Sequence, residues 1–193
     1  MTVKVDVGFT EDERAMVAAL YWQAFREKLG KVMGPEDKAL PFIIKALDPS
    51  HALVARQDGV LLGVAGIKTA DGTLVDGDFV DMRRTYGMLG ALWRIGLLSM
   101  LERELEPDVC QMDGIFVSAQ ARGKGVGTIL LDAVADHARQ TGARVVRLDV
   151  IDTNPRAEAL YRRRGFVPLK RENTGPLKWV FGFGSALKME REV

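Results

Sequence analysis

A glycine-rich stretch between an expected strand and an expected amphipathic helix contains the residue types best suited to bind an anion. It consists of Arg122, Gly123, Lys124, Gly125, Val126, Gly127 and Thr128. Because glycines leave the backbone N–H groups uncovered, those groups and the positive end of the helix dipole can bind a phosphate or a diphosphate. The same glycines would suit a tight turn between strand and helix, and the stretch alone leaves both interpretations open.

Two common phosphate-binding motifs do not fit this stretch. A Walker A loop ends in Gly-Lys-Ser/Thr, whereas Thr128 follows Gly123 by five residues without that triplet. The dinucleotide fingerprint Gly-x-Gly-x-x-Gly needs a glycine where Thr128 stands, and it follows the first strand of its fold rather than the fourth. Neither motif therefore explains the stretch.

The elements that must position the stretch follow from hydrophobic periodicity and from the residues that interrupt it. Thr10 and Glu13 form a capping box, Pro41 lies inside the second helix and can split it, and Asp58-Gly59 is a hairpin turn. The expected helices cover residues 11–29, 35–47, 78–106, 124–141 and 155–164, and the expected strands cover residues 3–9, 51–57, 60–69, 109–118, 144–151, 166–170 and 179–188. This order predicts one α/β domain over residues 1–193 with a mixed sheet.

Composition and charge exclude several classes of protein. The chain has 193 residues, 47% of them hydrophobic, and its 27 basic and 26 acidic side chains give a net charge of +1. A single cysteine, Cys110, and two histidines make a poor metal-ligand set, and a chain of this length needs no metal to hold its core. The near-neutral charge argues against a nucleic-acid partner.

Membrane and export signals are also missing from the sequence. The longest apolar stretch, residues 86–101, includes Arg94 and is shorter than the roughly 20 residues that span a bilayer. The first residues alternate polar and apolar types where a signal peptide needs an apolar run. We therefore expect no membrane partner and a cytoplasmic location.

The glycine-rich stretch and its surroundings resemble the GNAT superfamily of acyl-CoA-dependent N-acyltransferases. Arg122, Gly125 and Gly127 fit the superfamily's pyrophosphate loop, Arg/Gln-x-x-Gly-x-Gly/Ala. The resemblance covers residues 109–170, and the expected hairpin and N-terminal helices fit the usual lead-in. It implies an α/β (α+β) fold with a central mixed, mostly antiparallel sheet flanked by helices, and it implies acetyl-CoA as the acyl donor.

The resemblance also implies which residues bind the coenzyme A portion. The backbone of Ile115, Phe116 and Val117 would bond the pantetheine arm as an added strand does, and the glycine-rich stretch would hold the pyrophosphate. Asn154 resembles a residue that helps to hold the pantetheine. An Asn before Pro155 is also the expected N-cap of a helix, and the two roles are compatible.

Two side chains are expected to carry the chemistry. Tyr161 resembles the superfamily's general acid, because a phenol near the sulfur can protonate the departing thiolate, and a tyrosine packed in the core is the alternative. For the general base, Asp149 is a candidate because an acid in an apolar strand needs a partner or a function, and Asp113 is the other candidate. Asp149 could instead be a solvated acid paired with Arg147.

A helical insert at about residues 78–106 is the part that the resemblance explains least. Its apolar residues leave few positions for a solvated face. They are Met88, Leu89, Leu92, Trp93, Ile95, Leu97, Leu98, Met100 and Leu101. The domain itself, a second subunit in a homodimer or an apolar ligand could cover such a helix, and we expect burial against the domain with one edge lining the acceptor site.

The resemblance implies an N-acetyltransferase that moves an acetyl group from acetyl-CoA to a primary amine of a small molecule or a peptide. The amine would attack the thioester directly in a ternary complex. Transfer of a longer acyl chain or transfer to a hydroxyl is one alternative. A CoA-binding sensor without turnover is another, and Tyr161 argues against it.

Overall fold

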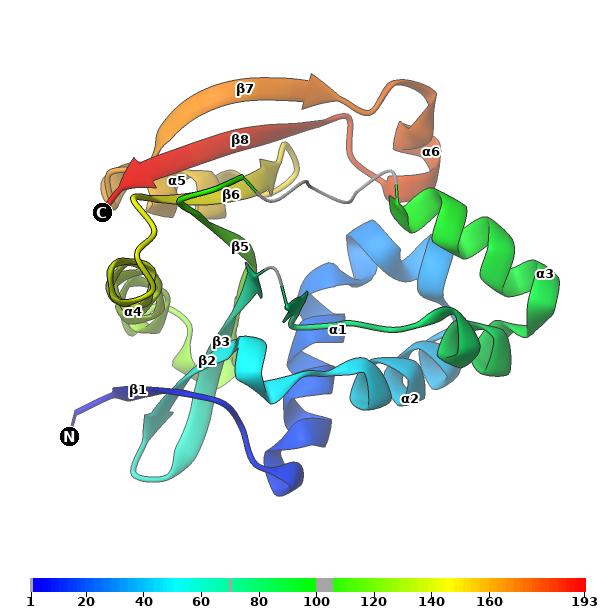
Figure 1. The fold of residues 1–193 in the computed structure, drawn as a ribbon, viewed down its shortest axis with the longest axis horizontal. Helices are drawn as coiled ribbons and strands as arrows, with labels where there is room; N and C mark the ends of the chain where they lie inside the picture. Colours follow the sequence, from blue (N-terminus) through cyan, green and yellow to red (C-terminus); the bar gives the residue numbers. More distant parts are fainter. Residues whose placement is uncertain (1, 70, 100–105) are drawn as a thin grey trace.

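The computed structural model describes residues 2–69, 71–99 and 106–193 (Figure 1). The strands are β1 (Lys4–Val7), β2 (Ala52–Gln57), β3 (Val60–Thr69), β4 (Gly72–Thr73), β5 (Val109–Val117), β6 (Val145–Ile151), β7 (Val167–Asn173) and β8 (Ser185–Glu192). The α-helices are α1 (Glu11–Met33), α2 (Glu36–Ala46), α3 (Phe79–Ser99), α4 (Val126–Gln140), α5 (Pro155–Arg163) and α6 (Lys178–Phe181). Short 3-10 turns cover Pro49–His51, Ala119–Ala121 and Gly175–Leu177.

One sheet of eight strands organises these elements. Its order is β1-β2-β3-β5-β6-β8-β7, and β4 pairs with β3 outside this path. Among the described strands, only β5 and β6 pair in parallel, and every other pair is antiparallel. The expected mixed, mostly antiparallel sheet flanked by helices is therefore confirmed.

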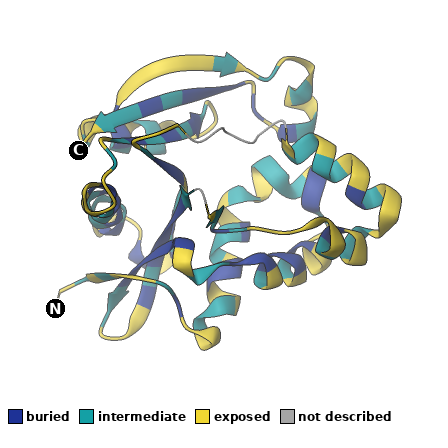
Figure 2. Ribbon diagram, viewed as in Figure 1, coloured by how far each residue is buried: buried dark blue, intermediate teal, exposed yellow. Residues whose placement is uncertain are grey.

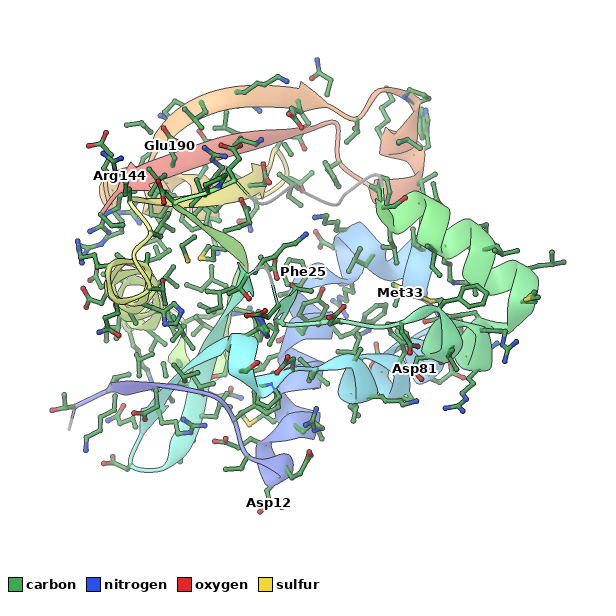
Figure 3. All side chains as sticks on the ribbon, viewed as in Figure 1. Asp12, Phe25, Met33, Asp81, Arg144 and Glu190 are labelled. Carbon is green, nitrogen blue, oxygen red and sulfur yellow. The ribbon has the colours of Figure 1, made fainter. Side chains whose placement is uncertain are left out.

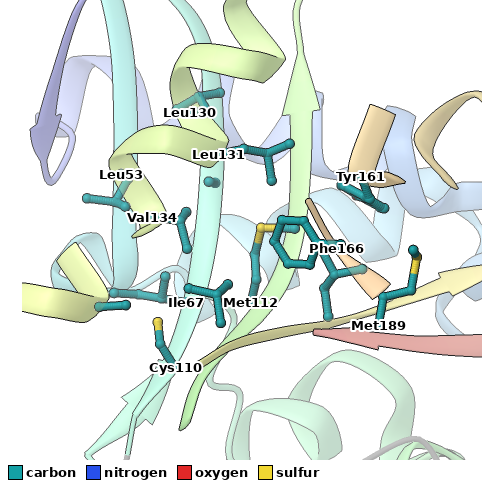
Figure 4. Close-up of a cluster of buried hydrophobic side chains, with 14 of the residues drawn as sticks. Leu53, Ile67, Cys110, Met112, Leu130, Leu131, Val134, Tyr161, Phe166 and Met189 are labelled. Atoms are coloured by element: carbon teal, nitrogen blue, oxygen red, sulfur yellow. The ribbon is translucent and has the colours of Figure 1, made fainter. Parts of the chain in front are cut away.

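Two apolar cores lie on opposite faces of the sheet. On one face, α4 places Leu130, Leu131 and Val134 against Ile67 and Met112 of the sheet (Figure 4). On the other face, α1, α2 and α3 cover the sheet with a second core, which includes Val17, Trp22, Phe42, Ile43 and Phe116. Figure 2 shows the buried residues gathered along the central strands and on the helix faces turned toward them.

Helix α1 continues past its predicted end at residue 29, and helix α2 continues past Pro41. The Thr10–Glu13 capping box forms as predicted, with the Thr10 N–H donating to Glu13 at 2.9 Å. Helix α1 ends at Met33 rather than near residue 29, because Val32 and Met33 are buried and stabilise a further turn. Helix α2 remains unbroken at Pro41. The residues of its inner face on either side of the proline are buried, and this packing stabilises the helix.

The C-terminal region differs most from the sequence prediction. The expected strand over residues 179–188 is wrong at its start, where residues 178–181 form α6 and β8 begins only at Ser185. Gly182, with φ at +74°, turns the chain so that Phe181 and Phe183 enter a small core with Val32. Phe181 and Phe183, whose residue type favours a strand, thus hold a turn in place by packing in this core.

The helical insert forms α3, which covers part of the predicted range. Gly87, at φ +74° and ψ +173°, breaks the helix into two pieces. Glu106 lies outside the helix, and the remainder of the predicted helical range, residues 100–105, lies outside the described residues. Among the described helices, none has both the length and the apolar character to cross a membrane.

Candidate active site

Strands β5 and β6 separate shortly after they pair. Their parallel ladder covers only Val109–Gln111 opposite Val145–Arg147. Beyond this point β5 stays paired with β3, and β6 stays paired with β8, so the two strands diverge (Figure 1). Within the described part of the chain, the edge of β5 that faces β6 therefore has no strand partner over residues 112–117.

The residues predicted to bond the pantetheine arm lie on this edge. The side chains of Ile115 and Val117 pack toward the α4 core, and Phe116 is buried in the core beneath α1. The backbone groups of Ile115 and Val117 point to the gap between β5 and β6, where an extended molecule can add as a further strand, whereas those of Phe116 point to β3. Two of the three predicted residues thus present backbone groups to the open edge, and their binding of a pantetheine arm stays a prediction.

A β-bulge interrupts β5 where the divergence begins. In the β3–β5 ladder Gly66 pairs with Gly114 and Ile67 pairs with Met112, so Asp113 is the extra residue. Gly114 must lack a side chain here, because the Phe25 ring lies 2.3 Å from the place that a Cβ would occupy. The bulge therefore brings Asp113 and the backbone of Gly114 against α1.

The glycine-rich stretch forms the start of α4, as predicted. Gly123 and Gly125 have φ of +76° and +81°, and the space where a Cβ would stand is open at both. The first intrahelical bond joins the Ile129 N–H to the Gly125 oxygen at 3.1 Å. In the described residues no side chain caps this helix, so the amides of residues 126–128 point out of its N-terminus toward a potential anion.

The other predicted residues of the stretch surround this helix start. Arg122 is exposed and donates from Nε to the Val117 carbonyl at 3.2 Å, which places its guanidinium at the end of β5. Lys124 is exposed as well. Gly127 has a different role, because a Cβ there would meet Leu160 of α5 at 3.3 Å. The stretch therefore combines uncovered amides with two nearby cations.

Tyr161 of α5 lies in the core on the α4 face, with its ring centroid 5.8 Å from that of Phe166 (Figure 4). Its hydroxyl makes no hydrogen bond with the described residues, and burial raises the pKa of the phenol. The phenol therefore keeps its proton at neutral pH, as an acid must. Asn154 forms the expected N-cap, accepting the Ala157 N–H at 3.2 Å.

The two candidate bases occupy equivalent places on the diverging strands. Asp113 and Asp149 each lie two residues beyond the last parallel pair, Gln111 and Arg147. Asp149 is half-buried, and its Cα lies opposite Lys188 in the β6–β8 ladder. Its suggested partner Arg147 forms ion pairs with two glutamates, Glu106 and, at 3.3 Å, Glu190.

Asp113 has the more unusual environment of the two. Its side chain is exposed to solvent, although neighbouring residues surround its carboxyl group. This burial raises the pKa of the carboxyl, and a hydrogen bond from the Thr73 hydroxyl opposes that rise. Lys68, Lys28 and the Leu74 amide also favour the ionised form.

Aromatic side chains of α1 cover the bulge from the other side. The Tyr21 ring centroid lies 4.6 Å from that of Phe25 and 5.8 Å from that of Phe116. Figure 3 shows Phe25 directed from α1 toward the sheet. Burial and the charge of Asp113 both raise the pKa of Tyr21. Tyr21 and Asp113 are therefore neighbours at this site.

A model of the acetyltransferase (GNAT) family matches residues 14–166, which include β5, β6 and the glycine-rich stretch. The chain belongs to this GNAT family. The curated relatives that match it carry acetyltransferase names.

Curated relatives match this GNAT protein over short segments. The streptothricin acetyltransferase of Streptomyces lavendulae is 42% identical over 55 residues, which cover 28% of this chain and 29% of that protein. The N-acetyltransferase YhfO of Bacillus subtilis (strain 168) is 38% identical over 64 residues, covering 33% of this chain and 40% of that protein. The matches to curated relatives thus span 26% to 40% of those proteins.

Solved structures match the GNAT protein along nearly its whole length. An N-acetyltransferase from Staphylococcus aureus Mu50 superposes with a TM-score of 0.68 at 16% identity, covering 97% of this chain and 100% of that chain. A ribosomal-protein-alanine N-acetyltransferase from Brucella melitensis gives a TM-score of 0.63 at 17% identity, with 100% of both chains covered. At these identities the likeness shows the fold.

Three residues of the GNAT site escaped prediction from the sequence. Tyr21 and Phe25 are spaced as ordinary inward-facing residues of a helix, and Thr73 lies in a turn-rich segment. The one signal that could have identified the aromatic pair is its i, i+4 spacing. Nothing in the sequence indicates that this pair meets Asp113 and Gly114, since more than 80 residues separate them.

Proposed function

We propose that the protein transfers an acetyl group from acetyl-CoA to a primary amine of a small molecule or a peptide. The observation that carries this proposal is the unpaired edge of β5 leading to the uncovered amides of residues 126–128. An extended arm ending in a diphosphate matches this arrangement, because the strand edge offers backbone hydrogen bonds and the helix start favours negative charge.

The two faces of the sheet suggest separate paths for donor and acceptor. Tyr161 belongs to the core on the α4 face, whereas Asp113 meets residues of α1 and β4 on the opposite face. The amine would approach along the α1 face, where Asp113 accepts its proton. Tyr161 would then supply a proton to the departing thiolate from the α4 face.

Asp113 is the stronger of the two candidates for the general base. It lies on the bulge, and a raised pKa lets a carboxylate accept a proton near neutral pH more readily. Asp149, at the equivalent place on β6, is the second candidate. Replacing each aspartate by Asn and measuring kcat/KM against pH separates them, since only the loss of the base removes the acid limb of the profile.

Two measurements on the intact chain test the proposed function. Calorimetric titration with CoA tests the binding site, and thiol release from acetyl-CoA across a panel of primary amines tests turnover. Binding without release with any amine would favour the CoA-binding sensor. Release only with longer acyl-CoA donors or with alcohols would assign a different acyltransferase reaction, and absence of CoA binding would overturn the proposal.

A further inference from the structure

The hairpin of β3 and β4 is held against the sheet from several sides. Buried His51 hydrogen bonds to Asp48 at 3.0 Å through Nδ1 and to the Thr69 hydroxyl at 2.9 Å through Nε2. A Cβ on Gly72 would lie 3.2 Å from the His51 ring, so the hairpin packs directly on it. Thr73 follows at the next position and therefore has a fixed place.

Backbone hydrogen bonds fix the segment that follows Thr73. The Asp48 N–H donates to the Leu74 carbonyl, and the Asp76 N–H donates to the Ala46 carbonyl, each at 2.9 Å. Leu74 itself is buried and fills the space beside Gly66 of β3. The Thr73 hydroxyl is thus presented by a segment anchored on both sides, which limits its movement relative to the bulge.

The Thr73 hydroxyl donates to the Asp113 carboxylate, although their strands β4 and β5 both pair with β3 and not with each other. The contact joins the anchored hairpin to the one residue of β5 that does not take part in the regular ladder. A bulged residue lacks the ladder bonds that orient its neighbours, so hydrogen bonds to its side chain help to set its direction. In the described structure, the Thr73 hydroxyl and the Leu74 N–H make those bonds.

We propose that Thr73 is a positioning residue that orients the Asp113 carboxylate and keeps it ionised for its role as general base. The proposal rests on the proposed acetyl transfer and adds a second residue to it. A hydroxyl that donates to a carboxylate stabilises the ionised form, whereas the surrounding protein favours the neutral form. The hydrogen bond from Thr73 therefore opposes the effect of the surrounding protein on the charge of Asp113.

Other ionisable groups also act on Asp113 and must be kept constant in a test. They come from α1, β3 and β5, and they are Tyr21, Lys28, Lys68 and Cys110. Tyr21 and Cys110 both have pKa values raised by burial and by the Asp113 charge, so both are neutral near pH 7. A substitution at Thr73 leaves all four in place.

The test compares Thr73→Val with Thr73→Ser and with a matched control, Thr141→Val. Valine keeps the volume of threonine and removes the hydroxyl, and serine restores the hydroxyl without the methyl group. Thr141 also donates a side-chain hydrogen bond, to the His137 carbonyl at 3.0 Å, but it lies at the far end of α4. The control therefore shows how far the loss of any hydrogen-bonded threonine hydroxyl changes the activity.

We expect Thr73→Val to move the acid limb of kcat/KM to higher pH by about one unit, because the neutral form of Asp113 is then favoured. Activity should recover at alkaline pH, Thr73→Ser should restore the original profile, and Thr141→Val should leave it unchanged. An unchanged profile for Thr73→Val, or a serine variant as impaired as the valine variant, would overturn the inference.

Titration of the aspartate carboxyl carbons by NMR provides a readout that does not depend on an acceptor. Comparison with Asp113→Asn assigns the Asp113 signal. We expect that signal to titrate at higher pH in Thr73→Val than in the parent and the serine variant. If no amine is acetylated, the proposed function fails while this titration still decides whether Thr73 controls Asp113, and an unchanged titration would refute that control.

Discussion

Gly125 and Gly127 are both needed at the start of α4, for different physical reasons. Gly125 has φ of +81°, a conformation that side-chain-bearing residues rarely adopt, and open space in front of it. Gly127 is helical, but a Cβ there would press on Leu160 of α5. The first glycine therefore keeps the space before the uncovered amides open, and the second allows two helices to pack.

Gly125→Val should abolish CoA binding, because it strains the loop and fills the space before the uncovered amides. Gly142→Val is a matched control, since Gly142 has φ of +82° with open space but lies at the far end of α4. We expect the control to lose stability to a similar degree and to bind CoA normally. Lys124→Ala should weaken binding modestly. Calorimetric titration measures the CoA affinity of all three variants. An affinity in Gly125→Val equal to that of the parent would refute the phosphate-site assignment.

Tyr161→Phe removes one hydroxyl from the α4 core and almost no volume. General acid groups typically contribute about 10²- to 10⁴-fold, so we expect kcat to fall within that range while CoA affinity stays the same. Steady-state kinetics at saturating acceptor, combined with calorimetry, measures both quantities. A parental kcat would assign Tyr161 to packing alone, consistent with its contact with Phe166.

The sequence predicts this site unevenly at the residue scale. The glycine-rich stretch is local, so its residues and their backbone geometry could be anticipated together. Tyr161 and Asn154 lie on a short helix whose N-cap chemistry is also local. By contrast, Thr73 meets Asp113 only because β3 pairs with both β4 and β5, and no local pattern encodes that meeting.

At the scale of elements, α3 presents two different faces. Its inner side packs Met82 and Ala91 into the core shared with α1 and α2. Its outer side exposes Met88, Leu89 and Leu92, the most exposed of which is Leu89 at 80%. The expected burial against the domain thus holds for one side of the insert, and a homodimer through the outer side stays a prediction.

Leu92→Glu and Leu98→Glu should affect the stability of the fold to different degrees. Leu92 is on the outer face, whereas Leu98 is half-buried between two apolar cores. We expect Leu92→Glu to leave the free energy of unfolding nearly unchanged and Leu98→Glu to lower it by about 2 kcal/mol or more, because a charge enters an apolar contact. Urea denaturation measures the difference, and equal losses would contradict the two-faced helix. Light scattering on Leu92→Glu reports whether the outer face joins two copies.

Element boundaries could be predicted where a local cap or breaker decides them, and not elsewhere. The capping box at Thr10 fixes the start of α1, whereas its end depends on the burial of Val32 and Met33 by distant residues. Similarly, the segment around Phe181 has the composition of a strand. Contacts with Val32, more than 140 residues earlier, favour a short helix there instead.

At the scale of the whole molecule, an ion pair ties the start of α1 to the sheet. Arg56 of β2 donates to Glu13 at 2.6 and 2.8 Å and to the Gly8 carbonyl at 3.0 Å. The hydrogen bonds from Arg56 lower the pKa of Glu13 to about 2. This single residue pair therefore joins the N-terminal segment, the first helix and the central hairpin.

Glu13→Gln should reduce stability in a pH-dependent manner. The pKa of Glu13 is lower in the folded state than its ordinary value of 4.5, so its contribution is present above pH 4.5 and is lost as the pH falls toward 2. We expect a deficit of at most about 3 kcal/mol at pH 7 that shrinks below pH 4.5. Thermal unfolding across this range checks it, with Glu158→Gln as control, because Glu158 pairs with Arg162 only within α5. A deficit independent of pH would contradict the ion-pair explanation.

Because the ladder between β5 and β6 is short, a small rotation there moves the far ends of the strands. Three residue pairs join the strands β1 to β5 to the strands β6 to β8, and β5 continues for six residues beyond them. At roughly 3.3 Å per residue, its far end lies about 20 Å from that junction. A rotation of a few degrees at the junction therefore moves the strand tips by an ångström or more. The opening between β5 and β6 can thus change its width through a small change of angle, without any rearrangement of the side chains that line it.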